Sequence, residues 1–117
     1  MSKISVAMFV LLATQVAAEE VYYCQGLELA EWSVPEQKLT QYKPQNFKFS
    51  IQQNQLHFGS GGYLDGTKLE ITRHIGRFLE ANSFLSQAAL DLNIGSFNFA
   101  HVGYDHITLI AAKCDKF

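Results

Sequence analysis

The chain lacks the residue patterns that mark many enzymes and cofactor sites. Only two of its 117 residues are cysteine, which leaves no closely spaced redox pair and no cysteine-rich metal site. Residues 61–68 place Thr before Lys, the reverse of a phosphate-binding loop, and Ser60 lacks the glycine that a nucleophile elbow has two positions earlier. With 9 basic against 11 acidic residues there is no basic excess for nucleic acid or anionic lipid.

Long apolar runs are also scarce, and the one that stands out is at the N-terminus. Residues 4–13 are mostly apolar, Lys3 precedes them, and small residues lead to Ala18 and then an acidic pair. This pattern predicts a signal peptide, residues 1–18, cleaved after Ala18. An apolar core of about ten residues is half the length that spans a bilayer, so we expect no transmembrane anchor in the mature form.

The mature chain, residues 19–117, has the size of a single small domain and is expected to be secreted or periplasmic. Cys24 and Cys114 lie close to its two ends. In an oxidising compartment the default state of two cysteines is a disulfide. The sequence therefore predicts one bond, Cys24 to Cys114, that ties the first strand to the last.

Short apolar or alternating segments recur between turn residues, which favours many short strands. Expected strands cover residues 21–24, 47–51, 56–58, 69–71, 90–92, 97–99 and 107–114, with connections at 52–55, 65–66 and 93–96. The predicted fold class is all-β, a small antiparallel β-barrel or sandwich of about eight strands closed by the disulfide.

Two segments are less clear. Residues 75–92 fit two strands, which the flanking strands favour, but the spacing of Ile75, Phe78, Leu79 and Leu85 also fits one face of a helix. Residues 26–44 are expected to form a long loop with a short strand near residues 39–42.

Near its start the mature chain has Val21-Tyr22-Tyr23-Cys24, and it ends with Lys-Cys-Asp-Lys-Phe at residues 113–117. Between them lie Phe-Lys-Phe at residues 47–49 and Phe-Gly-Ser-Gly-Gly-Tyr at residues 58–63. In these motifs it resembles a family of small exported bacterial proteins with no known activity. The resemblance implies a bacterial, periplasmic or secreted protein with paired cysteines, and it supplies no catalytic residues. More loosely, a small disulfide-closed barrel is similar in architecture to bacterial lysozyme inhibitors, although the chain carries no inhibitor motif.

Candidate chemistry is sparse. His101, Asp105 and His106 form the densest group of possible metal ligands, but their spacing is not that of a zinc site, and ordinary surface histidines are the simpler interpretation. Glu28 and Glu31 could form an acid–base pair, although loop carboxylates are usually solvated. We therefore expect no catalytic residues, no cofactor and no metal.

The preferred hypothesis is a non-catalytic binding or protein-interaction module of the bacterial envelope, whose partner is another envelope or extracellular protein. Trp32, Tyr42 and Tyr63 are the candidate contact residues, because amphipathic rings near turns either cover the core or bind a partner. The alternative is a lipocalin-like carrier of a small apolar ligand, although so aromatic a core in so short a chain favours a solid interior. The partner and the oligomeric state stay open.

Overall fold

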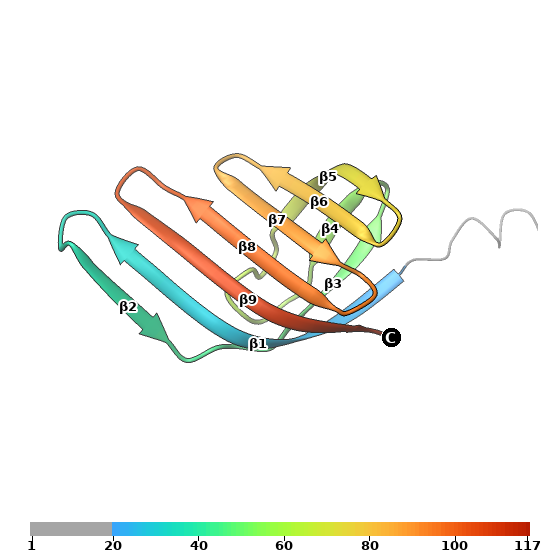
Figure 1. The fold of residues 1–117 in the computed structure, drawn as a ribbon, viewed down its shortest axis with the longest axis horizontal. Coiled ribbons are helices and arrows are strands. Elements are labelled where there is room, and N and C mark those ends of the chain that lie inside the picture. The colour runs from blue at the N-terminus through green and yellow to red at the C-terminus, as the bar shows by residue number, and fades with distance from the viewer. Residues whose placement is uncertain (1–19) are drawn as a thin grey trace, which may run out of the picture.

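The computed structural model describes residues 20–117, so the predicted signal peptide lies outside the described residues. In this part of the chain there are nine strands and no helix (Figure 1). The strands are β1 (Glu20–Ser33), β2 (Lys38–Tyr42), β3 (Phe47–Gln52), β4 (Gln55–Phe58), β5 (Lys68–Ile75), β6 (Phe78–Ser83), β7 (Ser86–Asp91), β8 (Ser96–Val102) and β9 (His106–Lys116).

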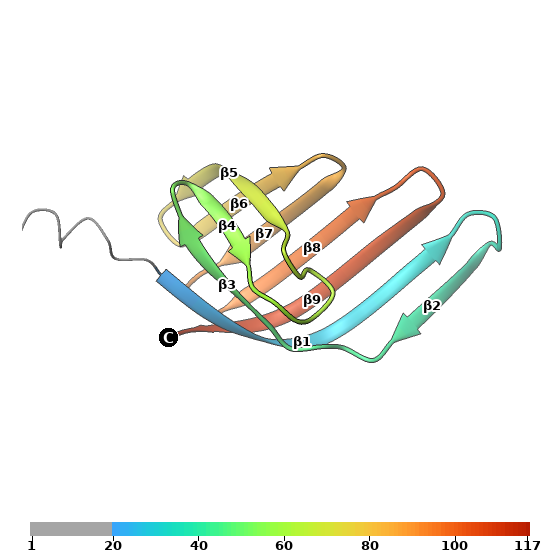
Figure 2. The ribbon, with the colours of Figure 1, turned by 180° about the vertical axis from the view of Figure 1, so that it is seen from behind.

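Eight of the strands close into an antiparallel barrel. The sheet runs from β3 through β9 in chain order, and β1 pairs with both β3 and β9, which joins the two ends of the sheet. The remaining strand, β2, pairs with the C-terminal part of β1 and forms the free edge of the sheet (Figure 2). The predicted all-β fold is confirmed, and it is a barrel with one extra strand.

Tight turns produce this meander. Gln53 and Asn54 both have positive φ between the paired residues Gln52 and Gln55, which matches the two-residue turn whose twist fits antiparallel strands. The predicted connection at residues 52–55 is therefore confirmed. The later connection between β7 and β8 is stabilised by Asp91, whose side chain accepts hydrogen bonds from the backbone N–H groups of Asn93 and Ile94.

Residues 75–92 form strands, as the flanking segments favoured. β6 and β7 pair with each other over six residue pairs, from Phe78 opposite Asp91 to Ser83 opposite Ser86. The helix-like spacing of apolar residues in this segment arises because a two-residue turn separates two strands, each with a period of two.

The long loop expected at residues 26–44 is wrong, whereas the short strand expected near residues 39–42 is confirmed as β2. β1 continues to Ser33, turns through residues 34–37, and returns as β2. The physical reason is a β-bulge at Leu27, which shifts the register against β9 between Gly26 and Glu28. A bulge adds one residue to a strand, so the alternation of apolar and polar side chains changes phase there and the strand is hard to recognise in the sequence.

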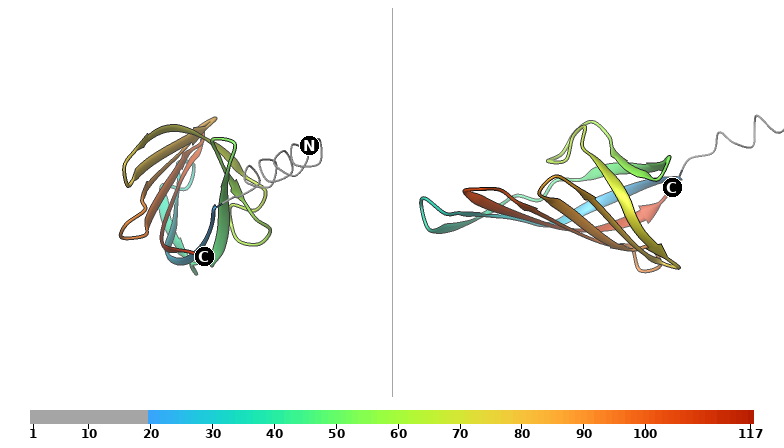
Figure 3. Two further views of the ribbon diagram at one scale, coloured as in Figure 1. Left: turned by 90° about the vertical axis from the view of Figure 1, so that its right-hand side faces the viewer. Right: turned by 90° about the horizontal axis from the view of Figure 1, so that it is seen from above.

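β1, β2 and β9 reach beyond the barrel. Residues 29–33 of β1 pair with β2 on one side and with residues 106–110 of β9 on the other. Figures 1 and 3 show these strands projecting past the short strands β3 and β4. We call residues 29–33, β2 and residues 106–110 the extension.

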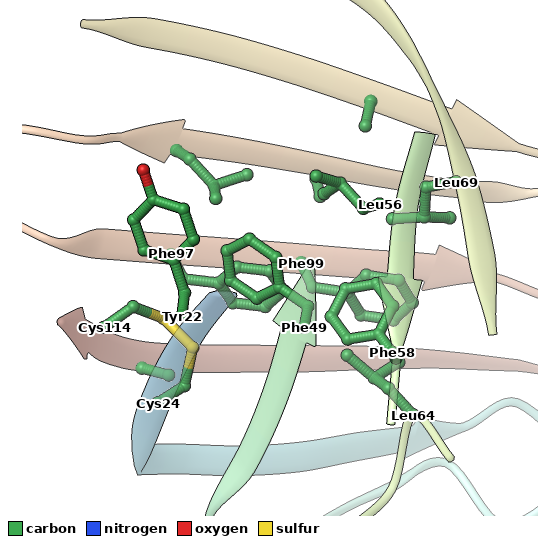
Figure 4. Close-up of a cluster of buried hydrophobic side chains, with 14 of the residues drawn as sticks. Tyr22, Cys24, Phe49, Leu56, Phe58, Leu64, Leu69, Phe97, Phe99 and Cys114 are labelled. Carbon is green, nitrogen blue, oxygen red and sulfur yellow. A yellow bond between two sulfur atoms is a disulfide. The ribbon is translucent and has the colours of Figure 1, made fainter. Parts of the chain in front are cut away.

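The barrel interior is filled by aromatic and aliphatic side chains (Figure 4). The ring of Phe49 stacks on Tyr22 and packs against Phe58 and Phe97, with ring centroids 5.0 to 6.1 Å apart. An eight-stranded barrel has an interior just wide enough for its side chains to fill. Ala81 and Ala88 are fully buried on the neighbouring strands, where their small size leaves room for these rings.

Cys24 and Cys114 lie directly opposite each other where β1 meets β9, and both are buried. They form a disulfide, as predicted. The bond therefore lies in the ladder that closes the barrel, and it joins residues 90 positions apart.

Candidate functional site

The outward side of the extension is apolar. Side chains alternate between the two faces of a strand, so residues paired across neighbouring strands share a face. Trp32 of β1 is paired with Leu39 of β2 and with Ile107 of β9, and Ile107 is paired with Val102 of β8. This row runs unbroken across four strands and ends at the edge of the sheet.

A second row lies beside the first. Ala30 of β1 is paired with Leu109 of β9, which in turn is paired with Ala100 of β8. We call the seven residues of the two rows the outer band: Leu39, Trp32, Ile107, Val102, Ala30, Leu109 and Ala100.

The large side chains of the outer band are open to solvent, whereas Ala30 is buried. These five large side chains are between 36 and 56% exposed. Beside Leu109 the surface is hollowed into a shallow groove of about 240 Å³, lined by Gln87, Ala89, Asn98, Phe99 and Ala100. The outer band contains no charged residue. Contiguous apolar surfaces that are exposed on small proteins are common at sites that bind another molecule.

The opposite face of the extension is polar and partly covered. The loop between β4 and β5 folds over it, with Leu64 buried in the core. Tyr63 of this loop has its hydroxyl 3.3 Å from the hydroxyl of Thr108, and Thr108 donates to the Glu31 carboxylate at 3.5 Å. Tyr63 therefore helps to cover the open end of the barrel.

Two histidines meet near this polar face. The rings of His101 and His106 lie 5.5 Å apart. His101 is hydrogen-bonded to the Ser86 hydroxyl, and His106 to the Asp105 carboxylate, at 2.8 Å each. The hydrogen bond from His106 holds the pKa of the Asp105 carboxyl below its usual range.

These histidines and their hydrogen-bond partners form neither a metal-binding cluster nor a Ser–His–Asp triad. Within residues 20–117, no group of three or more His, Cys, Asp or Glu side chains is placed to hold a metal ion. Ser86 and His101 are adjacent, but the carboxylate of Asp105 is bonded to the other histidine, His106. The arrangement therefore differs from a triad, in which the carboxylate orients the histidine that contacts the hydroxyl.

The three predicted contact residues lie on different faces. Trp32 belongs to the outer band and is in a strand, where the sequence suggested a loop. Tyr42 is paired with Leu29 in the β1–β2 ladder, so it shares the inner face. Tyr63 also lies on the inner side, beside Leu29 and Ile110. The structure brings Tyr42 and Tyr63 to one side of the extension and Trp32 to the other.

The remaining members of the outer band were not predicted. The expected strand at residues 107–114 did contain a signal, because Ile107 and Leu109 alternate with the buried residues Thr108 and Ile110. A strand with large apolar residues on its outward face needs a cover on that face. Leu39 carries no such signal, because the sequence predicts a short strand there without indicating that it pairs with β1.

The pocket beneath the loop between β4 and β5 leaves little room for a ligand. The space beneath Tyr63 and Leu64, lined also by Phe47 and Ile110, measures about 10 Å³. That is about the volume one water molecule needs. The groove at Leu109, by contrast, is open to solvent.

Comparisons with known proteins do not add a function. No protein-family model, curated protein or solved structure matches the chain. Between residues 20 and 117 there is no helix long and apolar enough to cross a membrane.

Proposed function

We propose that this protein is a non-catalytic protein-binding module of the bacterial envelope, and that its outer band is the contact surface. The single observation that carries the proposal is the uncharged apolar row Leu39–Trp32–Ile107–Val102, exposed on the outside of the sheet. Interfaces typically have such a core, depleted in charge and centred on an aromatic anchor. Trp32 lies between Leu39 and Ile107 and supplies that anchor.

The location in the envelope rests on two features. The N-terminal residues have the pattern of an export signal, and a disulfide is stable in an oxidising compartment. Together with the resemblance of the chain ends to small exported bacterial proteins, these features support a periplasmic or secreted protein.

The carrier hypothesis has less support. An apolar ligand needs an interior cavity of several hundred Å³, whereas the core rings of Phe49, Phe58 and Phe97 are in mutual contact. A lysozyme-inhibitor-like role shares only the barrel architecture with this chain, and no residue of the outer band is assigned by that analogy.

The proposal is tested by capture with matched variants. The oxidised mature protein, immobilised, is incubated with envelope extract from bacteria of the source strain, and bound proteins are identified by mass spectrometry. We expect the wild type to retain a defined partner, which the double variant Trp32→Ser, Leu109→Ser loses. The control variant Ile75→Ser, Phe84→Ser removes two apolar side chains outside the band that are more exposed than Trp32 and Leu109, and it should retain the partner.

Two outcomes contradict the proposal. If the band variant, shown to be folded by circular dichroism, retains every partner that the wild type retains, the outer band is not the contact surface. If the variant Tyr42→Ala, Tyr63→Ala loses the partner instead, the inner side of the extension binds it.

A further inference from the structure

The edge of β2 is unprotected. Among the described strands, β2 is the one with a single neighbour. Proteins usually protect such an edge with a proline, a bulge or several charges, because its free backbone groups can pair with another strand. β2 contains no proline, pairs with β1 without a shift in register, and has one charged residue, Lys38.

The free hydrogen-bonding groups of β2 can be assigned from its neighbours. The N–H of Val34 donates to the carbonyl of Asp105, at the turn end of the β1–β9 ladder. Backbone groups point to alternate sides along a strand, so Trp32 also faces β9, whereas Glu31 and Ser33 face β2. Because Glu31 is paired with Thr40, the backbone groups of Thr40 bond to β1. The same alternation along β2 directs those of Lys38 and Tyr42 toward β1.

Leu39 and Gln41 therefore direct their N–H and C=O groups toward the free edge. An antiparallel partner strand satisfies them best when its own free groups have the same spacing. A second copy of β2 meets this requirement, since Leu39 of each copy then lies opposite Gln41 of the other and both pairs are hydrogen-bonded. A two-fold axis passes between the two Thr40 residues, and two-fold pairing is the usual symmetry of dimers.

The side chains fit this register. The two Thr40 residues form a cross-strand pair that is favourable in sheets. Lys38 of each copy lies opposite Tyr42 of the other, where the ammonium group can rest on the ring. No like charges face each other. The axis is perpendicular to the sheet, so the outer bands of the two copies lie on the same side.

From these observations we propose that the protein forms a two-fold dimer in which the β2 strands of two copies pair across Thr40 into one continuous sheet. The dimer doubles the length of the outer band, because the row ending at Leu39 in one copy continues beside Gln41 and Ala30 of the other. The pairing uses backbone groups at the edge, so it does not depend on the partner proposed for the outer band.

The test is the mass of the oxidised mature protein by sedimentation velocity, from micromolar to millimolar concentration. We expect a reversible shift from monomer to dimer. Gln41→Pro removes one edge N–H donor from each copy but leaves the bonds to β1 intact, so the dissociation constant should rise by about tenfold or more. Gln41→Ala also loses the side-chain hydrogen bond to Glu28 but keeps the backbone donor, and should dimerise like the wild type.

Thr40→Lys is a second variant, which should disfavour the dimer and leave the fold of each monomer intact. Within one copy the new lysine lies opposite Glu31, which is favourable, whereas across the axis two lysines face each other, which is unfavourable. The dimer should therefore be lost and the fold retained. A wild type that stays monomeric at every concentration overturns the proposal, as does dimerisation unaffected by Gln41→Pro and Thr40→Lys. Trp32→Ser, Leu109→Ser should dimerise normally, which separates this result from the capture experiment.

Discussion

Removing the disulfide is expected to take away a large part of the stability of this fold. The bond joins Cys24 to Cys114, 90 positions apart, so in the unfolded chain it closes almost the whole described domain into a loop. The chain-entropy relation for a loop of this length gives about 4.5 kcal/mol at room temperature. Small domains are stable by about 5–15 kcal/mol in total, and this bond therefore accounts for about 30% or more of the stability.

The variant Cys24→Ala, Cys114→Ala suits this measurement, because alanine leaves no unpaired polar group in the buried site that serine would create. With a urea dependence of about 1.5 kcal/mol per molar, the unfolding midpoint should fall by about 3 M. The melting temperature should fall by about 20–30 °C. Far-UV circular dichroism is the appropriate probe because it reports on all nine strands.

A comparison with reduced wild-type protein separates the loss of the disulfide from the loss of the two sulfur atoms in the core. Reduction breaks the bond but keeps both sulfur atoms in the core, so any further loss in the alanine variant reports packing. If the midpoint of the reduced wild type falls by less than about 0.5 M, the closure entropy of the long loop is not what the bond contributes, and the reasoning fails.

Three further predictions concern the fold. Phe97→Ala, at a fully buried ring, should lower the free energy of unfolding by about 3–5 kcal/mol, whereas Phe84→Ala, at an exposed ring, should change it by less than about 0.5 kcal/mol in the same urea titration. Gly95→Ala should prevent stable folding because the added Cβ collides with the Cys114 carbonyl, while Gly66→Ala, also at positive φ but facing open space, should cost about 1–2 kcal/mol. Burial, and then the Glu20 carboxylate, raises the pKa of Tyr22; the folded state thus holds that proton more tightly than the unfolded chain. The stability from this shift is complete below about pH 10 and is lost as pH rises through the higher folded pKa, and Tyr22→Phe should flatten that alkaline decline.

Much of the barrel could be predicted because its strands follow simple patterns. Residues 47–51 alternate between core and surface, and the turn at Gln53 and Asn54 contains asparagine, a residue that tolerates positive φ. Once the compartment is inferred, Cys24 and Cys114 leave a single pairing. Each of these signals is local or depends on only two residues, so it can be recognised in the sequence without knowledge of the tertiary structure.

The extension could not be predicted because its cause is not local. The bulge at Leu27 exists where β1 stops pairing with β3 and begins to pair with β2, and the segment that crosses between them lies against Gly26. A side chain at position 26 would collide with the Gln45 backbone. The glycine that reads as a loop residue in the sequence is therefore required by close approach of two backbones inside a strand.

The same geometry explains why the candidate site became visible only in three dimensions. Leu39, Trp32, Ile107 and Val102 come from four strands, and their sequence separations follow no motif. The described strands form a single sheet that closes into a barrel, so no second layer covers the outward face of β1 and β9. The inner face of this sheet forms the core, so a row of large apolar residues on the outer face is not required by the packing of the barrel itself. The cost of exposing Trp32 and Leu39 at a free edge is a tendency to associate, which is why we assign the band to a partner and the edge beside it to a second copy of the chain.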